Sequence, residues 1–193
     1  MFFFLCVFVQ VTILYSQDND KYFKRLNTVV TGSEATDRIA EDYFRLANSK
    51  LEKGLFKEAI LDYNKALHAD STYALAYNNR GIARRNTENF VGALEDFSKA
   101  IEFNPGYEEA YNNRGNIKLD IQDYKGAIED YSKVLEINRK LADSYNNRGL
   151  ARKYIGEYED ALEDFTRAEE IERRFSDAYN NRGLTKNDLK DYE

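Results

Sequence analysis

Residues 74–107, ALAYNNRGIARRNTENFVGALEDFSKAIEFNPGY, decide the fold, because the chain repeats their pattern on both sides. The tetrapeptide Asn-Asn-Arg-Gly in this stretch begins at Asn78, Asn112, Asn146 and Asn180, always 34 residues apart. A period of this length is typical of a helix-turn-helix unit, which cannot bury its apolar face alone. Neighbouring units must therefore stack and leave a long curved surface. The spacing predicts an all-α stack of helix pairs whose surface binds other molecules.

The repeat frame holds without insertion from residue 40 onward. In the first helix of a unit, Tyr77 and Gly81 are four residues apart and lie on one face. In the second helix, Phe90, Ala93 and Phe97 follow spacings of three and four, which are typical of a buried helical stripe. Large rings then face small residues, as close packing requires. The predicted units are 40–73, 74–107, 108–141 and 142–175, followed by a half repeat or cap at 176–193.

With this order of aromatic, Gly, Ala, aromatic and Ala, the units resemble tetratricopeptide (TPR) repeats over residues 40–193. The resemblance implies a right-handed superhelical solenoid in which the first helices line a concave groove. The chain departs from the family pattern in two ways. Arg or Lys replaces the usual Leu and Tyr of the first helix, and the terminal Pro is present only as Pro105. Because Pro is only one of several helix stops, the same fold is expected.

A column of basic residues in the first helices is matched by a column of acids in the second helices. Charges with matched opposite partners are normally neutralised within the protein. We therefore expect Arg–Asp pairs between packed helices that fix the stacking register, with an anion-binding strip as the alternative. The columns are Arg80, Arg114, Arg148 and Arg182, then Arg84, Lys118, Arg152 and Lys186 one turn later, and the acids Asp62, Asp96, Asp130 and Asp164.

Asparagines are the candidate binding residues, because the TPR resemblance places repeat positions five and six in the groove. A carboxamide has donors and an acceptor, so it can bond the N–H and C=O of an extended peptide without reading its side chains. The position-six column is similar to the asparagine ladder of the O-GlcNAc transferase TPR domain. The alternative is hydrogen bonding at a tight helix junction, copied by repeat duplication. The predicted peptide-binding residues are Asn78, Asn79, Asn112, Asn113, Asn146, Asn147, Asn180 and Asn181.

Other groove positions indicate which charge the ligand is expected to have. Position two is acidic in four units, which favours a basic ligand or simply suits the dipole at the start of a helix. A known TPR mode grips a terminal carboxylate with Lys and Arg, but Phe44 and Asn78 stand where a key Lys is needed. A clamp for chaperone tails is therefore not expected. The acids at position two are Glu41, Glu109, Asp143 and Asp177.

Composition argues against several classes of function. The net charge of −6, from 34 acidic and 28 basic residues without a basic run, argues against a nucleic-acid partner. His68 is the only histidine and is expected to be solvated, and the chain has no phosphate-cradling glycine loop and no His or Cys cluster. We expect a non-catalytic protein- or peptide-binding scaffold or adaptor with no cofactor, metal or small-molecule substrate. The alternatives are the N-terminal sensory or targeting region of a larger enzyme or signalling protein, and self-association through repeat faces.

The amino-terminal segment is apolar from Phe2 to Tyr15, and no charged side chain precedes Asp18. It is too short to span a bilayer comfortably, and its polar end favours a secretory signal peptide at residues 1–16. The sequence thus predicts an exported protein, whether periplasmic, secreted or membrane-anchored, with a cytoplasmic location as the alternative. Membrane contact is expected only through an uncleaved leader. Residues 17–39 are predicted to form a linker and the start of the first helix.

Overall fold

The computed structural model describes residues 33–190, and the predicted signal peptide at 1–16 lies outside them, so export stays a prediction. The described residues form nine helices and no strand, as expected for an all-α repeat fold. The helices are α2 (Ser33–Glu52), α3 (Phe56–Ala69), α4 (Ala74–Asn86), α5 (Phe90–Phe103), α6 (Glu108–Asp120), α7 (Tyr124–Ile137), α8 (Ala142–Tyr154), α9 (Tyr158–Ile171) and α10 (Ser176–Lys190).

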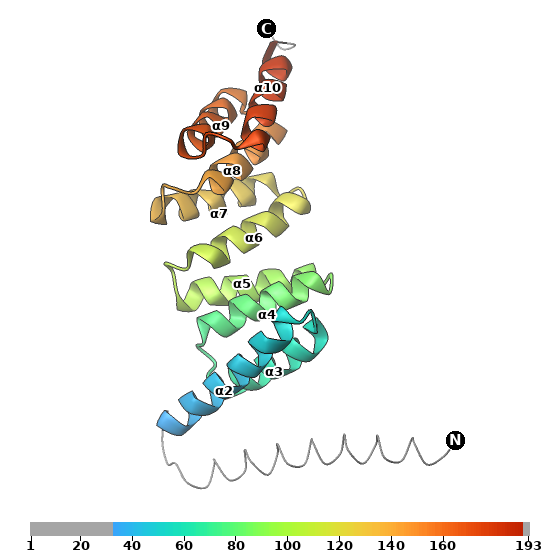
Figure 1. The fold of residues 1–193 in the computed structure, drawn as a ribbon, viewed down its shortest axis with the longest axis vertical. Coiled ribbons are helices and arrows are strands. Elements are labelled where there is room, and N and C mark those ends of the chain that lie inside the picture. Colours follow the sequence, from blue (N-terminus) through green and yellow to red (C-terminus); the bar gives the residue numbers. More distant parts are fainter. Residues whose placement is uncertain (1–32, 191–193) are drawn as a thin grey trace, which may run out of the picture.

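The helices stack along the long axis of the molecule, from α2 at one end to α10 at the other (Figure 1). Each even-numbered helix is the first helix of a unit, and α2, α4, α6 and α8 each pack against the odd-numbered second helix that follows. Each second helix also contacts the first helix of the next unit, and successive first helices touch one another. The predicted solenoid of helix pairs is confirmed, and its first helices share one side of the stack.

The turn between the two helices of a unit is closed in two ways. Gly54 and Gly156 have φ angles of 73° and 82°, in the left-handed region that glycine adopts without steric cost. At the corresponding place in α4–α5, Glu88 has a φ of 62°. Here the side chain of Asn89 accepts a hydrogen bond from the backbone N–H of Gly92 at 3.0 Å. Such a cap contributes about 1 kcal/mol and offsets the left-handed conformation of a residue that is not glycine.

A large ring from the second helix fills the space left by the glycine of the first helix. Phe97 and Phe165 are completely buried. A Cβ atom added to Gly81 would lie 2.7 Å from the Phe97 ring, and one added to Gly149 would lie 2.8 Å from the Phe165 ring. The expected pairing of large with small residues is therefore present, and glycine is needed because the ring occupies the place of a side chain.

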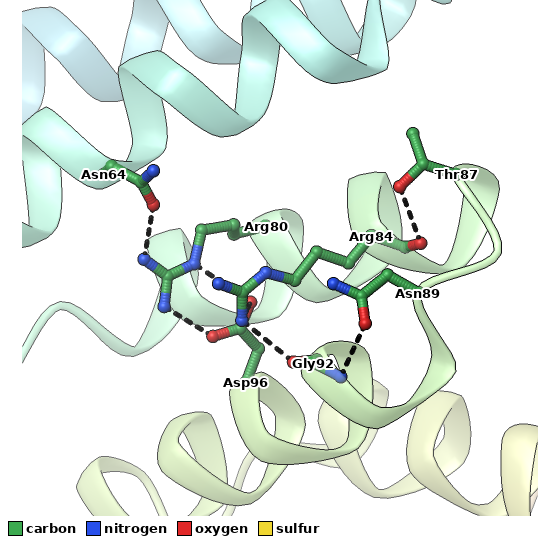
Figure 2. Close-up of polar contacts among 7 residues, drawn as sticks. All are labelled: Asn64, Arg80, Arg84, Thr87, Asn89, Gly92 and Asp96. Carbon is green, nitrogen blue, oxygen red and sulfur yellow. Dashed lines mark hydrogen bonds and ion pairs between the residues drawn. The ribbon is translucent and has the colours of Figure 1, made fainter.

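The predicted Arg–Asp pairs are also confirmed, and each Arg makes a further contact to the preceding unit. Arg80 donates from Nε and Nη2 to the carboxylate of Asp96 at 2.9 and 2.6 Å, and from Nη1 to Asn64 Oδ1 at 2.7 Å (Figure 2). Arg84 adds a second cation at 2.9 Å from Asp96 and donates to the carbonyl oxygen of Gly92. We call this set the arginine clamp: one Arg, the Asp 16 residues later and the polar residue 16 residues earlier.

The arginine clamp recurs in the next two units. Arg114 bonds Asp130 at 2.6 Å and Ser98 at 3.0 Å, and Lys118 lies 2.9 Å from Asp130. The Asp side chain is only 2% exposed, so its charge depends on these cations for solvation. Since each Arg joins second helices of two successive units, the clamp fixes both the fold of a unit and the register of the stack. The corresponding residues of the next unit are Arg148 and Arg152 of α8 and Asp164 of α9, with Ser132 of α7 in the preceding unit.

The first unit replaces the clamp by a simpler ion pair. Leu46 stands at the Arg position, and Asp62 instead pairs with Lys50 and Lys65. Asp62 is as buried as its counterparts, at 2% exposure. The first unit has no preceding second helix within the described residues, so an Arg here would have no second partner to bridge.

Replacing Asp130 by Asn is expected to lower the free energy of unfolding by roughly 3 kcal/mol, because Arg114 and Lys118 lose the buried carboxylate that pairs them. The control is Asp120→Asn, which makes the same chemical change at an exposed site and should alter stability by less than about 0.5 kcal/mol. Urea denaturation followed by circular dichroism measures both. Equal effects of the two substitutions would contradict a structural role for the clamp.

The same Gly→Ala change is expected to have opposite effects at two equivalent positions. Gly149→Ala should destabilise the protein by about 1–2 kcal/mol, because the methyl group meets the Phe165 ring. Gly183→Ala should stabilise it by up to about 1 kcal/mol, because nothing lies within 4 Å and Ala favours a helix. Thermal melting of the two variants provides the comparison, and destabilisation of both to the same extent would show that ring contact is not the cause.

Candidate functional site

The first helices of three successive units enclose a pocket of about 260 Å³. Its apolar lining comes from Ile82 of α4 and from Leu141 directly before α8. Carboxylates of Glu108, Glu109 and Asp143 surround this apolar lining. We call it the groove pocket. The remaining residues that line it are Asn78, Asn112, Asn113 and Ser144.

The structure divides the eight predicted asparagines by exposure. Asn78 and Asn146 are buried, at 3% and 7% exposure, and Asn180 is exposed. The other five are half-buried on the first-helix side. A ligand on this surface therefore meets the half-buried set first, whereas the two buried residues serve mainly as partners within the protein. The half-buried residues are Asn79, Asn112, Asn113, Asn147 and Asn181.

Two chains of side-chain amides connect successive first helices. In one, Asn113 donates to Asn78 at 3.1 Å, Asn78 donates to Asn79 at 3.1 Å, and Asn79 donates to Asn48 at 3.0 Å. These bonds correspond to the alternative interpretation of the asparagines, hydrogen bonding at a helix junction. Each amide nitrogen has two hydrogens, so this single bond leaves donor capacity at Asn113. The second chain runs through Asn181, Asn146, Asn147 and Asn116, with bonds of 2.9, 3.3 and 3.4 Å.

The terminal acceptors of these chains, Asn48 and Asn116, were not among the predicted site residues. Each also accepts a hydrogen bond from a buried tyrosine, from Tyr63 at 2.6 Å and from Tyr131 at 2.7 Å. Burial raises the pKa of both tyrosines, which keeps their hydroxyl groups protonated as donors. A buried hydroxyl needs such an acceptor.

The second and fourth units carry a different pair of residues at the positions that Tyr and Asn occupy in the first and third units. There the second-helix ring is Phe97 or Phe165, and the first-helix residue is Ile82 or Leu150. Tyr is thus matched by Asn, and Phe by an aliphatic residue, with a period of two units. This alternation is visible in the sequence and marks Asn48 and Asn116 as partners of the tyrosines.

The groove pocket contains a buried acceptor without a donor. Asn112 Oδ1 is inaccessible to solvent and has no hydrogen-bond partner among the described residues. Nearby, burial raises the pKa of Tyr107 to about 12, and the negative charge of Glu109 contributes to this rise. The acidic residues Glu108, Glu109 and Asp143 give the pocket a negatively charged lining that suits a hydrogen-bond donor or a cation.

The acids at repeat position two have different surroundings in different units. Glu41 accepts hydrogen bonds from the Tyr73 hydroxyl at 2.6 Å and from Arg45 at 2.9 Å. The bond from Tyr73 lowers the pKa of Glu41. Glu109 and Asp143, in contrast, line the groove pocket. Of the four predicted acids, these two are therefore the ones placed to meet a ligand there.

A larger pocket of about 700 Å³ lies between α4 and α5, on the side of the second helices. Its lining includes Arg80, Arg84 and Asp96, which are bonded to one another in the arginine clamp (Figure 2). Because these cations already have a carboxylate partner, the alternative of an anion-binding strip is not supported here. The groove pocket is the better candidate site, since the described residues form no ion pair with its Glu109 and Asp143.

Other predicted features can be compared with the described part of the chain. His68 is exposed on α3, as expected. Between residues 33 and 190 no cluster of His, Cys, Asp and Glu is arranged to hold a metal ion. None of the described helices combines the length and apolar character that crossing a membrane requires.

Removing the Tyr131 hydroxyl by Tyr131→Phe is expected to cost about 1 kcal/mol of stability, because Asn116 Oδ1 loses its shorter hydrogen bond. Adding Asn116→Leu recreates the Phe165–Leu150 pair of the next unit. The double variant should therefore lose less stability than the sum of the two single variants. Urea denaturation of all four proteins measures this coupling, and strictly additive losses would contradict the Tyr–Asn pairing.

Comparisons with known proteins agree with this architecture. Family models described as tetratricopeptide repeat match residues 40–73, 74–107 and 142–175, and one described as TPR repeat matches 115–153. No curated protein sequence matches the chain.

Several solved structures are similar in fold. The MamA protein is 26% identical, with a TM-score of 0.73, over 76% of this chain and 80% of that one. YrrB, described as a TPR protein with an unusual peptide-binding site, is 23% identical, with a TM-score of 0.72, over 84% of this chain and 87% of that one. The first TPR of Spaghetti (RPAP3), bound to the HSP90 peptide SRMEEVD, is 23% identical, with a TM-score of 0.60, over 63% of this chain and 96% of that one. With these matches and its stacked 34-residue units, the chain belongs to the tetratricopeptide repeat family.

Proposed function

We propose that the protein is a non-catalytic scaffold that binds an extended peptide along the first-helix side of its solenoid. The observation that carries the proposal is the groove pocket, where three successive first helices bring Asn113 together with Glu109 and Asp143. Membership of the TPR family supports a role in protein interaction, as do the similar structures described with a peptide or a peptide-binding site.

The chemistry of the groove pocket favours a peptide with a basic side chain. Ile82 and Leu141 provide apolar contacts for the methylene groups of a Lys or Arg. Glu109 and Asp143 provide carboxylates for its charged end.

The half-buried asparagines extend the proposed site beyond the pocket. Asn79, Asn113 and Asn147 each use one amide hydrogen within the amide chains. The second amide hydrogen of Asn113 is the one we propose for a carbonyl group of a peptide backbone. Peptide affinity in this arrangement comes from the backbone, and side-chain preference comes from the pocket.

This preference is opposite in charge to that of the RPAP3 domain, whose peptide SRMEEVD ends in acidic residues. In this chain Phe44 and Asn78 occupy the positions where a carboxylate clamp needs Lys. The groove pocket adds the negative charges of Glu109 and Asp143, which would repel an acidic peptide. An acidic chaperone tail is therefore a poor ligand for this groove.

The test compares two fluorescein-labelled ten-residue peptides of alternating Ser and Ala that differ only in a central Lys or its uncharged analogue norleucine. Fluorescence anisotropy with the full chain is expected to show at least fivefold tighter binding of the Lys peptide, because only Lys pairs with Glu109 and Asp143. The variant Glu109→Gln/Asp143→Asn should remove this difference.

A control with the same loss of charge is Glu159→Gln/Asp160→Asn in the first turn of α9, which should keep the preference for Lys. Replacing Asn79, Asn113 and Asn147 together by Ala is expected to weaken both peptides equally while the helical circular dichroism signal persists. Equal binding of the two peptides by the parent chain would contradict the basic preference, and binding that survives the triple substitution would contradict the backbone contacts.

A further inference from the structure

The pocket of about 700 Å³ between α4 and α5, which we call the α5 pocket, has an exposed apolar end. Val91, in the first turn of α5, lies there and is 71% exposed, more than any other large apolar side chain among the described residues. The half-buried side chains of Leu94 and Tyr77 continue this apolar lining. An exposed apolar patch with a polar border is typical of a surface that binds another protein. In the other second helices the residue that corresponds to Val91 is charged: Lys57, Lys125 or Glu159.

The charged residues that line the α5 pocket are paired, with one exception. Its two arginines bond Asp96 in the arginine clamp, and Lys99 pairs with Glu102 at 2.7 Å. Glu95 is exposed and forms no ion pair with the other described residues. Because Glu95 and Val91 are four residues apart, they are neighbours on the surface of α5. An unpaired negative charge beside exposed apolar surface favours a ligand that carries both a cation and apolar groups.

The α5 pocket follows the axis of α5. Its lining residues on this helix run from Val91 to Glu102, a length of about 16 Å at 1.5 Å per residue. Tyr77, Arg80 and Arg84 of α4 also line it, so it lies between two helices. A groove of this length matches about three turns of a further helix, whose side chains at spacings of three and four residues face one way. The shape therefore favours a helix as the ligand.

The second helix α9 has a smaller counterpart of this pocket. Its volume is about 350 Å³, and among the described residues only those of α9 line it. Glu159, which stands at the place of Val91, is not part of this lining. The apolar end thus distinguishes the α5 pocket from the corresponding surface of α9. The residues that line the smaller pocket are Leu162, Glu163, Thr166, Arg167 and Glu170, which correspond to Leu94, Glu95, Ser98, Lys99 and Glu102.

We propose that the α5 pocket docks an amphipathic helix of a partner protein. Apolar residues on one face of this helix cover Val91, Leu94 and Tyr77. A Lys or Arg beside them pairs with Glu95, whose charge has no partner within the described residues. The α5 pocket shares no residue with the groove pocket, so this proposal does not depend on the proposed peptide site.

The probe is the fluorescein-labelled peptide LAALKAALAALKAA, whose leucines form one helical face with the lysines beside it, added to the full chain. Fluorescence anisotropy is expected to show saturable binding. The same peptide with Gln in place of Lys should bind at least threefold more weakly, because it has no cation for Glu95. The Glu109→Gln/Asp143→Asn variant of the protein should bind the Lys peptide unchanged, which separates this site from the groove pocket.

Variants of the protein locate the contact on α5. Val91→Lys introduces the residue that α3 and α7 carry at this position, so circular dichroism and thermal melting should stay intact while peptide binding falls at least tenfold. Glu159→Gln, an equal change of charge at the corresponding position of α9, should leave binding unchanged. Glu95→Gln should remove the preference for the Lys peptide over the Gln peptide, whereas Glu129→Gln, the same change on α7, should keep it.

The contrary results are equally specific. No saturable binding of the Lys peptide, or binding that Val91→Lys leaves unchanged, would overturn the proposal. Sedimentation velocity of the parent chain and of Val91→Lys identifies a second copy as the occupant. Self-association of the parent chain that Val91→Lys abolishes would replace the partner helix by another copy of this protein.

Discussion

The buried Asp at the centre of each arginine clamp is the constraint on which the rest of the stack depends. With 2% exposure, Asp96 or Asp130 cannot keep its charge unless cations reach it within the protein. The bidentate Arg and the second cation meet this need, and the remaining N–H of the Arg reaches the preceding unit. The Arg that solvates the buried Asp of its own unit therefore also fixes the position of the preceding unit.

The clamp joins first helices to second helices, whereas the asparagines join first helices to one another. The amide chains that they form end at Asn48 and Asn116, where buried tyrosines donate. Clamp and amide chain thus hold the two sides of the stack in the same register. Between the two chains lies Asn112, whose buried oxygen has no donor. Asn112 also lines the groove pocket, the proposed peptide site.

The proposed peptide-binding surface is defined by its charge. The groove pocket is acidic, with Glu108, Glu109 and Asp143 in its lining, and therefore suits a basic, extended ligand.

The sequence by itself determined the helix pairs, their 34-residue period and the Arg–Asp pairing, because each recurs at fixed spacing and spacing on a helix sets which side chains meet. The pairing of Tyr131 with Asn116 is also visible in the sequence, but only because Tyr occurs with Asn, and Phe with an aliphatic residue, in alternate units. The tertiary structure alone decided which asparagines are buried, that Asn112 Oδ1 lacks a donor and that Gly183 is uncovered. Identical Asn-Asn-Arg-Gly letters have different surroundings at each site, because exposure and hydrogen bonding depend on the neighbouring units, which a local pattern does not describe.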